Sequence, residues 1–156
     1  MTAANHDPQA ATSIIDSFDA RPEMLVQILH AFMEQFAWIS KDAIRQLAEE
    51  LNLSRADVHG VVSFYHDFRT TAPGRHIIKI CEAEACQAMG SRELSTHAAK
   101  SLGVDMHSSN DDVTLEPVYC LGNCACSPAV MVDGKTYGRV STQRFDDIVA
   151  SLWKSD

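Results

Sequence analysis

The sequence predicts an α+β protein in two parts, an N-terminal helical bundle followed by an α/β domain with a small mixed sheet. Two observations lead to this prediction. Amphipathic helical patterns dominate residues 23–68, and from residue 76 onward short β-branched runs alternate with helical patterns. The chain has 156 residues, of which 46% are hydrophobic and 22% are charged. This length and composition fit one globular domain or two small ones.

The N-terminal part is expected to begin with a flexible tail over residues 1–20, and a helical domain follows over residues 21–72. In the first expected helix, residues 23–36, the apolar side chains share one face: Leu25, Ile28, Leu29, Phe32 and Phe36. Ser40 is expected to cap a second helix that turns Ile44, Leu47 and Leu51 inward.

A third helix is expected to open at Ser54, which forms a variant capping box with Asp57. Its inward positions are expected to be Val58, Val62, Tyr65 and Phe68. Residues 70–74 contain Pro and Gly and break the helical pattern. They therefore mark the boundary to the second domain.

The second domain, residues 73–156, is predicted to contain a strand over 76–80, a helix over 91–102 and a strand over 113–119. Two more short strands, 129–132 and 137–140, flank Asp133-Gly134, which is a strong hairpin signal. A final helix is expected to begin at Thr142. A β-α-β unit followed by β-β-α gives a small sheet with helices on its faces, which is the thioredoxin-like arrangement.

All five cysteines lie in this second domain, at Cys81, Cys86, Cys120, Cys124 and Cys126. An odd, clustered set argues against a disulfide framework and for metal or redox chemistry. Four of them form a C-x4-C pair and a C-x3-C pair. Structural zinc usually takes C-x2-C pairs, so the wider spacing favours a [2Fe-2S] cluster over zinc. Zinc and buried structural cysteines remain alternatives at this point.

Both pairs follow predicted strands, where the loops of an α/β sheet tend to build sites, so the two loops are expected to converge on one cluster. Small or turn-tolerant residues near the cysteines would let backbone N–H groups approach the sulfurs. These residues are Ala83, Ala85, Gly122 and Asn123. Cys126 is expected to be a small apolar filler, with a spare ligand or a redox-sensitive thiol as the alternative.

Charge and composition exclude other classes. The net charge of −8 disfavours nucleic acid and anionic lipid as partners. Residues 1–16 contain no Lys, no Arg and no apolar block, which predicts a cytoplasmic protein, and no membrane insertion is expected. Residues 44–65 are similar to a helix-turn-helix, so an iron-sulfur transcription regulator is a rival interpretation. The acidic balance of residues 40–69 argues against it.

The motifs together resemble the thioredoxin-like [2Fe-2S] subunit family of respiratory complex I, NAD-reducing hydrogenases and NAD-dependent formate dehydrogenases. The resemblance covers about residues 23–153. Its motifs are Ile28-Leu29-His30, Trp38-Ile39, Leu51-Asn52-Leu53, Val61-Val62-Ser63-Phe64-Tyr65, Phe68, Pro73-Gly74, the C-x4-C pair and Cys120-Leu121-Gly122-Asn123-Cys124. Residues 81–90 and the compact length most resemble the gamma subunit of soluble formate dehydrogenase, with the complex I (NADH:quinone oxidoreductase) subunit or the hydrogenase subunit as the alternative.

The resemblance implies that Cys81, Cys86, Cys120 and Cys124 are the ligands of one [2Fe-2S] cluster, with one pair on each iron. It also implies that the helical domain docks on a flavoprotein subunit that binds FMN and NAD. A larger catalytic subunit, with a molybdenum cofactor in formate dehydrogenase, would complete the complex. Hydride transfer moves two electrons and a cluster moves one, so this subunit would carry or store single electrons beside the FMN, with no catalytic residues of its own.

Overall fold

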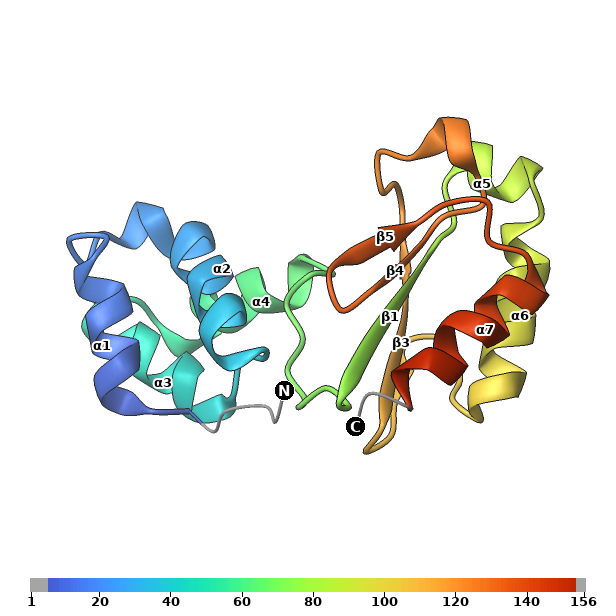
Figure 1. The fold of residues 1–156 in the computed structure, drawn as a ribbon. Coiled ribbons are helices and arrows are strands. Elements are labelled where there is room, and N and C mark those ends of the chain that lie inside the picture. Colours follow the sequence, from blue (N-terminus) through green and yellow to red (C-terminus); the bar gives the residue numbers. More distant parts are fainter. Residues whose placement is uncertain (1–5, 154–156) are drawn as a thin grey trace. The chain divides into compact units, whose positions relative to one another are not determined.

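The structure is a computed structural model and describes residues 6–153. The chain divides into two compact units between Ala72 and Pro73, a helical unit and a sheet unit (Figure 1). Each unit has its own hydrophobic core. No helix within residues 6–153 is both long and apolar enough to cross a bilayer.

Over residues 6–72, the helical unit contains four α-helices and one short 3-10 turn. They are α1 (Pro8–Asp16), η1 (Pro22–Met24), α2 (Leu25–Phe36), α3 (Lys41–Glu50) and α4 (Arg55–Phe64). The apolar face predicted for residues 23–36 is buried, with Ile28, Leu29 and Phe32 fully shielded from solvent. Amphipathic helices of this length are stabilised mainly by such packing.

Both predicted N-caps of this unit are present. The Ser40 hydroxyl accepts a hydrogen bond from the Ala43 N–H at 3.0 Å. Ser54 and Asp57 form the complete capping box, in which the Asp57 N–H donates to the Ser54 hydroxyl at 3.1 Å and the Ser54 N–H donates to the Asp57 carboxylate at 3.2 Å. These bonds satisfy N–H groups that have no partner inside the helix.

The predicted flexible tail over 1–20 is wrong for residues 8–16, because these residues form α1. Ala11 and Ile15 of this helix are fully buried in the core of the helical unit, and Thr12 donates a hydrogen bond to Glu50 of α3 at 2.8 Å. The sequence did carry a helix-start signal here, because the Asp7 carboxylate accepts a hydrogen bond from the Gln9 N–H at 2.9 Å and Pro8 opens the helix. Residues 1–5 of the expected tail lie outside the described residues.

The third helix is shorter than predicted, because α4 ends at Phe64 and Tyr65 is already extended. Tyr65 was expected to point inward, but 41% of its surface is exposed. Phe68 is buried as predicted, and its ring packs edge-on against the His30 ring with the centroids 4.9 Å apart. Phe68 is therefore buried as part of the segment that follows α4, not as part of the helix.

The sheet unit holds a five-stranded mixed sheet in the order β2-β3-β1-β4-β5. The strands are β1 (His76–Cys81), β2 (Ser108–Ser109), β3 (Val113–Val118), β4 (Val130–Val132) and β5 (Lys135–Tyr137). β1 pairs in parallel with β3 and antiparallel with β4. The predicted hairpin at Asp133-Gly134 is present, although its second strand begins at Lys135 and ends at Tyr137.

The helices of the sheet unit are α5 (Glu84–Ala88), α6 (Ser91–Leu102) and α7 (Thr142–Leu152), with a 3-10 turn, η2 (Cys124–Cys126). Alternate strand residues, including Ile78, Ile80 and Leu115, pack in one core with Leu94 of α6 and Phe145 of α7. Both long helices therefore lie on the same face of the sheet (Figure 1). The predicted α+β class with a small mixed sheet is confirmed.

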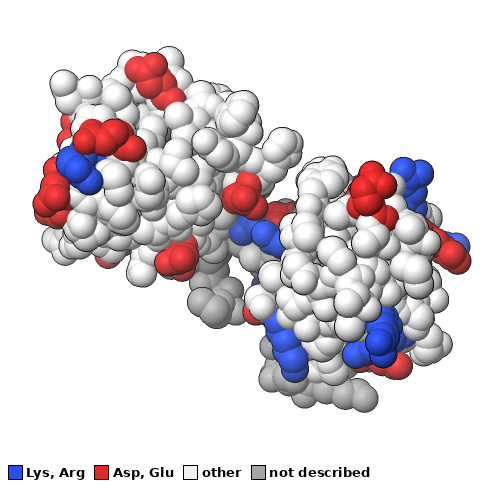
Figure 2. Space-filling model, turned by 90° about the horizontal axis from the view of Figure 1, so that it is seen from above, with Lys and Arg blue, Asp and Glu red and all other residues white. Residues whose placement is uncertain are grey.

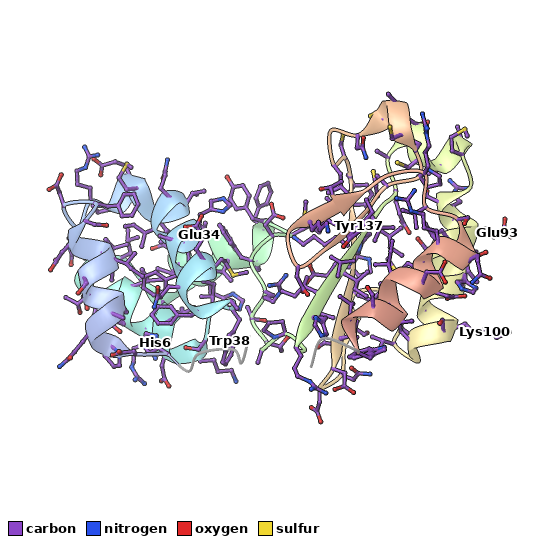
Figure 3. The ribbon with its side chains drawn as sticks, in the orientation of Figure 1. His6, Glu34, Trp38, Glu93, Lys100 and Tyr137 are labelled. Atoms are coloured by element: carbon purple, nitrogen blue, oxygen red, sulfur yellow. The ribbon has the colours of Figure 1, made fainter. Side chains whose placement is uncertain are left out.

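α6 has the predicted bounds and signals. Gly103 follows it in the left-handed conformation, with φ of 64°, which favours glycine. Glu93 in the first turn and Lys100 in the last turn complement the helix dipole, and both side chains point outward in Figure 3. After α6 the chain passes through β2 into β3, and the second cysteine pair follows the end of β3.

Candidate metal centre

The topology of the sheet brings the two cysteine pairs to the same edge. Cys81 is the last residue of β1, and Cys120 lies two residues beyond the end of β3. These strands are parallel, with Cys81 beside Val118, so their carboxyl ends meet. In Figure 3, sulfur atoms gather at the end of the sheet unit where α5 and the loop before β4 lie. The predicted convergence of the two loops is therefore observed.

The first pair, Cys81 and Cys86, is buried. Each residue is only 2% exposed, and both pack against Ala129. Burial raises the pKa of the Cys81 thiol above its ordinary value, with a hydrogen bond to Cys86 adding to the effect. Burial also opposes ionisation of Cys86, but hydrogen bonds from Ser127, Cys81 and the Ala129 backbone outweigh it and lower the pKa of Cys86. The pKa of Cys86 is therefore lower than that of Cys81, so Cys86 ionises first.

The second pair, Cys120 and Cys124, is exposed to solvent. A hydrogen bond with the Cys120 thiol raises the pKa of Cys124, and the charge on Cys86 contributes in the same direction. The pKa of Cys124 is therefore raised mainly by its own partner, Cys120.

The loop that carries the second pair has an unusual backbone. Cys120 has a φ of 143°, a region that non-glycine residues rarely adopt, and Gly122 follows with a φ of 69°. The Gly122 N–H donates to the Cys120 sulfur at 3.3 Å. Strained backbone of this kind is often found at functional sites. In this loop the unusual backbone occurs at Cys120, the cysteine whose sulfur accepts the Gly122 hydrogen bond.

Further hydrogen bonds join the loops around the sulfurs. Backbone N–H groups of Ala83 and Leu121 approach Cys81, so the first pair receives a bond from the loop of the second pair. The Ser127 hydroxyl lies 3.4 Å from the Cys86 sulfur and donates to the Cys124 carbonyl oxygen at 2.8 Å. Small residues near the sulfurs were predicted to allow such approaches, and Ala83 and Gly122 do so. Hydrogen bonds of this type stabilise negative sulfur.

Cys126, the fifth cysteine, lies half-buried in η2. Its carbonyl oxygen accepts a hydrogen bond from the Arg139 N–H at 2.6 Å. The chain after β5 passes so close that a Cβ added at Gly138 would lie 2.7 Å from the Cys126 Cβ and 2.7 Å from the Asn123 amide nitrogen. Cys126 therefore sits where the hairpin packs against the second cysteine loop.

The donor set fits a two-iron cluster. Four thiols associate as two pairs, and a [2Fe-2S] cluster takes two thiolates at each iron. Within residues 6–153, no group of three or more His, Cys, Asp or Glu side chains is placed so that it could already hold a metal ion. Cys81, Cys86, Cys120 and Cys124 are the residues that would hold the cluster, and this ligand set stays a prediction.

Exposed apolar side chains lie close in sequence to both cysteine pairs. Tyr119, next to Cys120, is 68% exposed, and Met89, which follows α5, is 62% exposed. Figure 2, which views the molecule from above this end, shows that the facing surface of the sheet unit is mostly uncharged, with its charged side chains toward the edges. Exposed apolar groups beside a site are typical of contact surfaces.

Comparison with known proteins identifies the family. The family model for thioredoxin-like [2Fe-2S] ferredoxins matches residues 11–153. The chain belongs to this family. Among similar members, an NADH-quinone oxidoreductase subunit from Pseudomonas aeruginosa is 35% identical over 117 residues, which is 74% of this chain and 70% of that protein. The Escherichia coli protein of the same name is 28% identical over 126 residues, which is 80% of this chain and 76% of that protein.

A solved structure of an NAD+-reducing [NiFe]-hydrogenase in the air-oxidised state also shares the fold of this ferredoxin. The TM-score is 0.70 at 19% identity, over 85% of this chain. The chain spans only 23% of that hydrogenase chain. At this identity the likeness concerns the fold alone.

The sequence missed two features of this thioredoxin-like ferredoxin site. α5 begins inside the C-x4-C loop and continues past Cys86 to Ala88, and the helix formers Glu84 and Ala85 were a weak signal for it. Ser127 was also missed, since no sequence spacing relates this serine to Cys86, which is 41 residues away. Contacts of this kind depend on tertiary structure.

Proposed function

We propose that this chain is the [2Fe-2S] electron-transfer subunit of an NADH:quinone oxidoreductase, with Cys81 and Cys86 on one iron and Cys120 and Cys124 on the other. The convergence of the two cysteine loops at the carboxyl ends of β1 and β3, where Ser127 contacts both Cys86 and Cys124, carries this proposal. Family membership supports the cluster type, and the names of the similar proteins support the parent complex.

The choice of parent complex differs from the sequence-based prediction of a formate dehydrogenase gamma subunit. The similar proteins above are subunits of NADH-quinone oxidoreductase, and the comparisons do not support formate dehydrogenase or a molybdenum-containing partner. They favour the alternative, the complex I subunit. An NAD-reducing hydrogenase is the second candidate, because the chain shares its fold with part of such an enzyme.

The residues of this chain would hold and insulate a centre that, when bound, exchanges one electron at a time. The buried pair lies away from water, and the N–H groups of Ala83, Leu121 and Gly122 would stabilise the negative sulfurs. The exposed pair would face the partner, so electrons would enter and leave beside Cys120 and Cys124. The chain would bind no substrate and would contain no catalytic residue.

The partners would be a flavoprotein subunit that binds FMN and NAD and a larger catalytic subunit. A flavin converts the two-electron chemistry of NADH into single-electron steps, so the cluster would carry or store electrons beside the FMN. The helical unit would dock on the flavoprotein. Its exposed aromatic side chains Phe64, 74% exposed, and Tyr65 offer an apolar contact.

Affinity purification of the tagged full chain from its native cell tests this assignment. Co-elution with a flavoprotein and with membrane-arm subunits is expected, and co-elution with a molybdenum enzyme would restore the formate dehydrogenase interpretation. A Phe64→Ala variant should lose the flavoprotein while keeping the visible spectrum of the cluster. A matched Trp153→Ala variant removes an aromatic side chain that is 41% exposed in the other unit and should keep the flavoprotein.

A further inference from the structure

Ser127 connects the two cysteine loops through one hydroxyl group. Its oxygen lies 3.4 Å from the sulfur of Cys86, a residue of α5. The same hydroxyl group donates a hydrogen bond to the carbonyl oxygen of Cys124, which begins η2, and the two oxygens are 2.8 Å apart. One side chain therefore contacts a sulfur of the first pair and the backbone of the second.

The direction of these hydrogen bonds depends on the state of Cys86. A serine hydroxyl has one proton to donate and two lone pairs to accept with. While Cys86 is a thiol, its S–H can donate to Ser127, whose own proton goes to the Cys124 carbonyl. A cysteine that binds metal does so as a thiolate and has no proton to give. The contact with Cys86 then persists only when Ser127 is the donor.

The loop can accommodate this reversal without leaving a polar group unpaired. The Cys124 carbonyl oxygen also accepts a hydrogen bond from the Ser127 backbone N–H at 3.3 Å. When the hydroxyl proton turns toward Cys86, this second bond still satisfies the carbonyl. Both bonds come from the same residue, so the hydroxyl is free to turn while the loop keeps its conformation.

We propose that Ser127 is a positioning residue whose hydroxyl donates a hydrogen bond to the Cys86 thiolate and so raises the reduction potential of the cluster. The inference rests on the proposed function, in which Cys86 is a ligand. On reduction by dithionite, one electron is added, no bond breaks, and the hydroxyl proton stays on Ser127. The added electron makes the sulfur more negative, so a donor at this position stabilises the reduced form more than the oxidised form.

Two variants of equal shape test this role, Ser127→Thr and Ser127→Val, because they differ only in whether a hydroxyl is present. The backbone of Ser127, with φ of −66° and ψ of 152°, is in the extended region that β-branched residues prefer and that a residue before proline adopts. Redox titration of the full chain, followed by electron paramagnetic resonance, should give a near wild-type midpoint for the Thr variant. The midpoint potential of the Val variant should be lower by ~59 mV. This shift corresponds to an about tenfold lower ratio of reduced to oxidised cluster at a given potential.

A Ser151→Ala variant is the matched control. Ser151 also donates its hydroxyl to the carbonyl three residues earlier, Ile148 at 2.6 Å, but it lies in α7. Its midpoint should equal that of the wild type. Pulsed resonance of the reduced protein in H2O and D2O gives a second readout. An exchangeable proton coupling present in the Thr variant should be missing from the Val variant.

Equal midpoints for Thr and Val variants that both carry a full cluster would overturn the inference. Should a β-branched variant fail to fold, Ser127→Ala against the wild type makes the same comparison. An alanine variant that is folded by circular dichroism yet takes up no cluster would also overturn it, because the hydroxyl would then hold the loop rather than set the potential. A wild-type chain without a [2Fe-2S] spectrum would instead overturn the proposed function.

Discussion

At the residue scale, the two cysteine pairs differ in their surroundings. Cys81 and Cys86 are buried against Ala129, whereas Cys120 and Cys124 face solvent. An iron held by the buried pair would be shielded from water, and an iron held by the exposed pair would lie nearer a partner. This asymmetry would give the proposed centre a direction for electron exchange, because transfer would favour the side that a partner can approach.

Substitution of the cysteines tests the ligand set residue by residue. Serine at position 81, 86, 120 or 124 replaces a soft thiolate with a hard hydroxyl, so each variant should lose or visibly alter the cluster. Cys126→Ser is the matched control and should retain it. Iron content and visible absorption measure the outcome. Loss of the cluster in Cys126→Ser, with retention in one of the other four, would show that the ligand set is different.

Gly138 tests whether close packing positions the second cysteine loop. A methyl group there would lie 2.7 Å from the Cys126 Cβ, so Gly138→Ala should force the loop to shift and cost about 1–3 kcal/mol of unfolding free energy. Gly60→Ala is the control, since a Cβ at this helical position meets nothing within 4 Å and should stabilise α4 by about 0.5–1 kcal/mol. Chemical denaturation compares the two, and equal stabilities would contradict this account.

At the element scale, the parts of the fold with strong local signals were predictable and those set by tertiary contacts were not. The Ser40 and Ser54 caps, the stop at Gly103 and the hairpin at Asp133-Gly134 each follow from side-chain chemistry near one position. α1 was missed although Asp7 caps it and Pro8 opens it, because its apolar pattern is short and was interpreted as a tail. The cysteine spacing predicted the pairs, but only the parallel register of β1 and β3 shows that they meet.

Ile15→Ala tests whether α1 belongs to the core. This side chain is fully buried, so its truncation should lower the free energy of unfolding of the helical unit by about 2–5 kcal/mol. Ser13→Ala, at an exposed position of the same helix, should change it by less than about 0.5 kcal/mol. Thermal or urea unfolding provides the measurement. An Ile15→Ala protein as stable as the wild type would mean that α1 contributes no packing.

Asp133 tests the anchoring of the hairpin to β1. Its carboxylate accepts a hydrogen bond from the Ile77 N–H at 2.8 Å and contacts the His76 ring at 2.7 Å, and its backbone has a φ of 49°. Asp133→Ala removes both contacts at a strained position and should cost about 2 kcal/mol. Asp133→Asn keeps an acceptor and tolerates this conformation, so most stability should remain. Equal losses in the two variants would contradict this role.

At the scale of the whole molecule, the sheet unit is proposed to hold the cluster and the helical unit to bind the flavoprotein. All five cysteines lie in the sheet unit, and each unit has a separate core. A fragment of residues 73–156 should therefore fold and accept a [2Fe-2S] cluster, while binding the flavoprotein more weakly than the full chain does. Reconstitution of the fragment and a pull-down with the flavoprotein measure both properties. A fragment that folds but remains colourless would show that the helical unit is needed for the centre.

The central claim is that four sulfurs of this chain hold two irons. Iron, acid-labile sulfide and zinc measured together on the anaerobically isolated full chain test it most directly. About two irons and two sulfides per chain are expected, with visible charge-transfer absorption and a paramagnetic signal after reduction by dithionite. A colourless chain containing stoichiometric zinc and no sulfide would contradict the account.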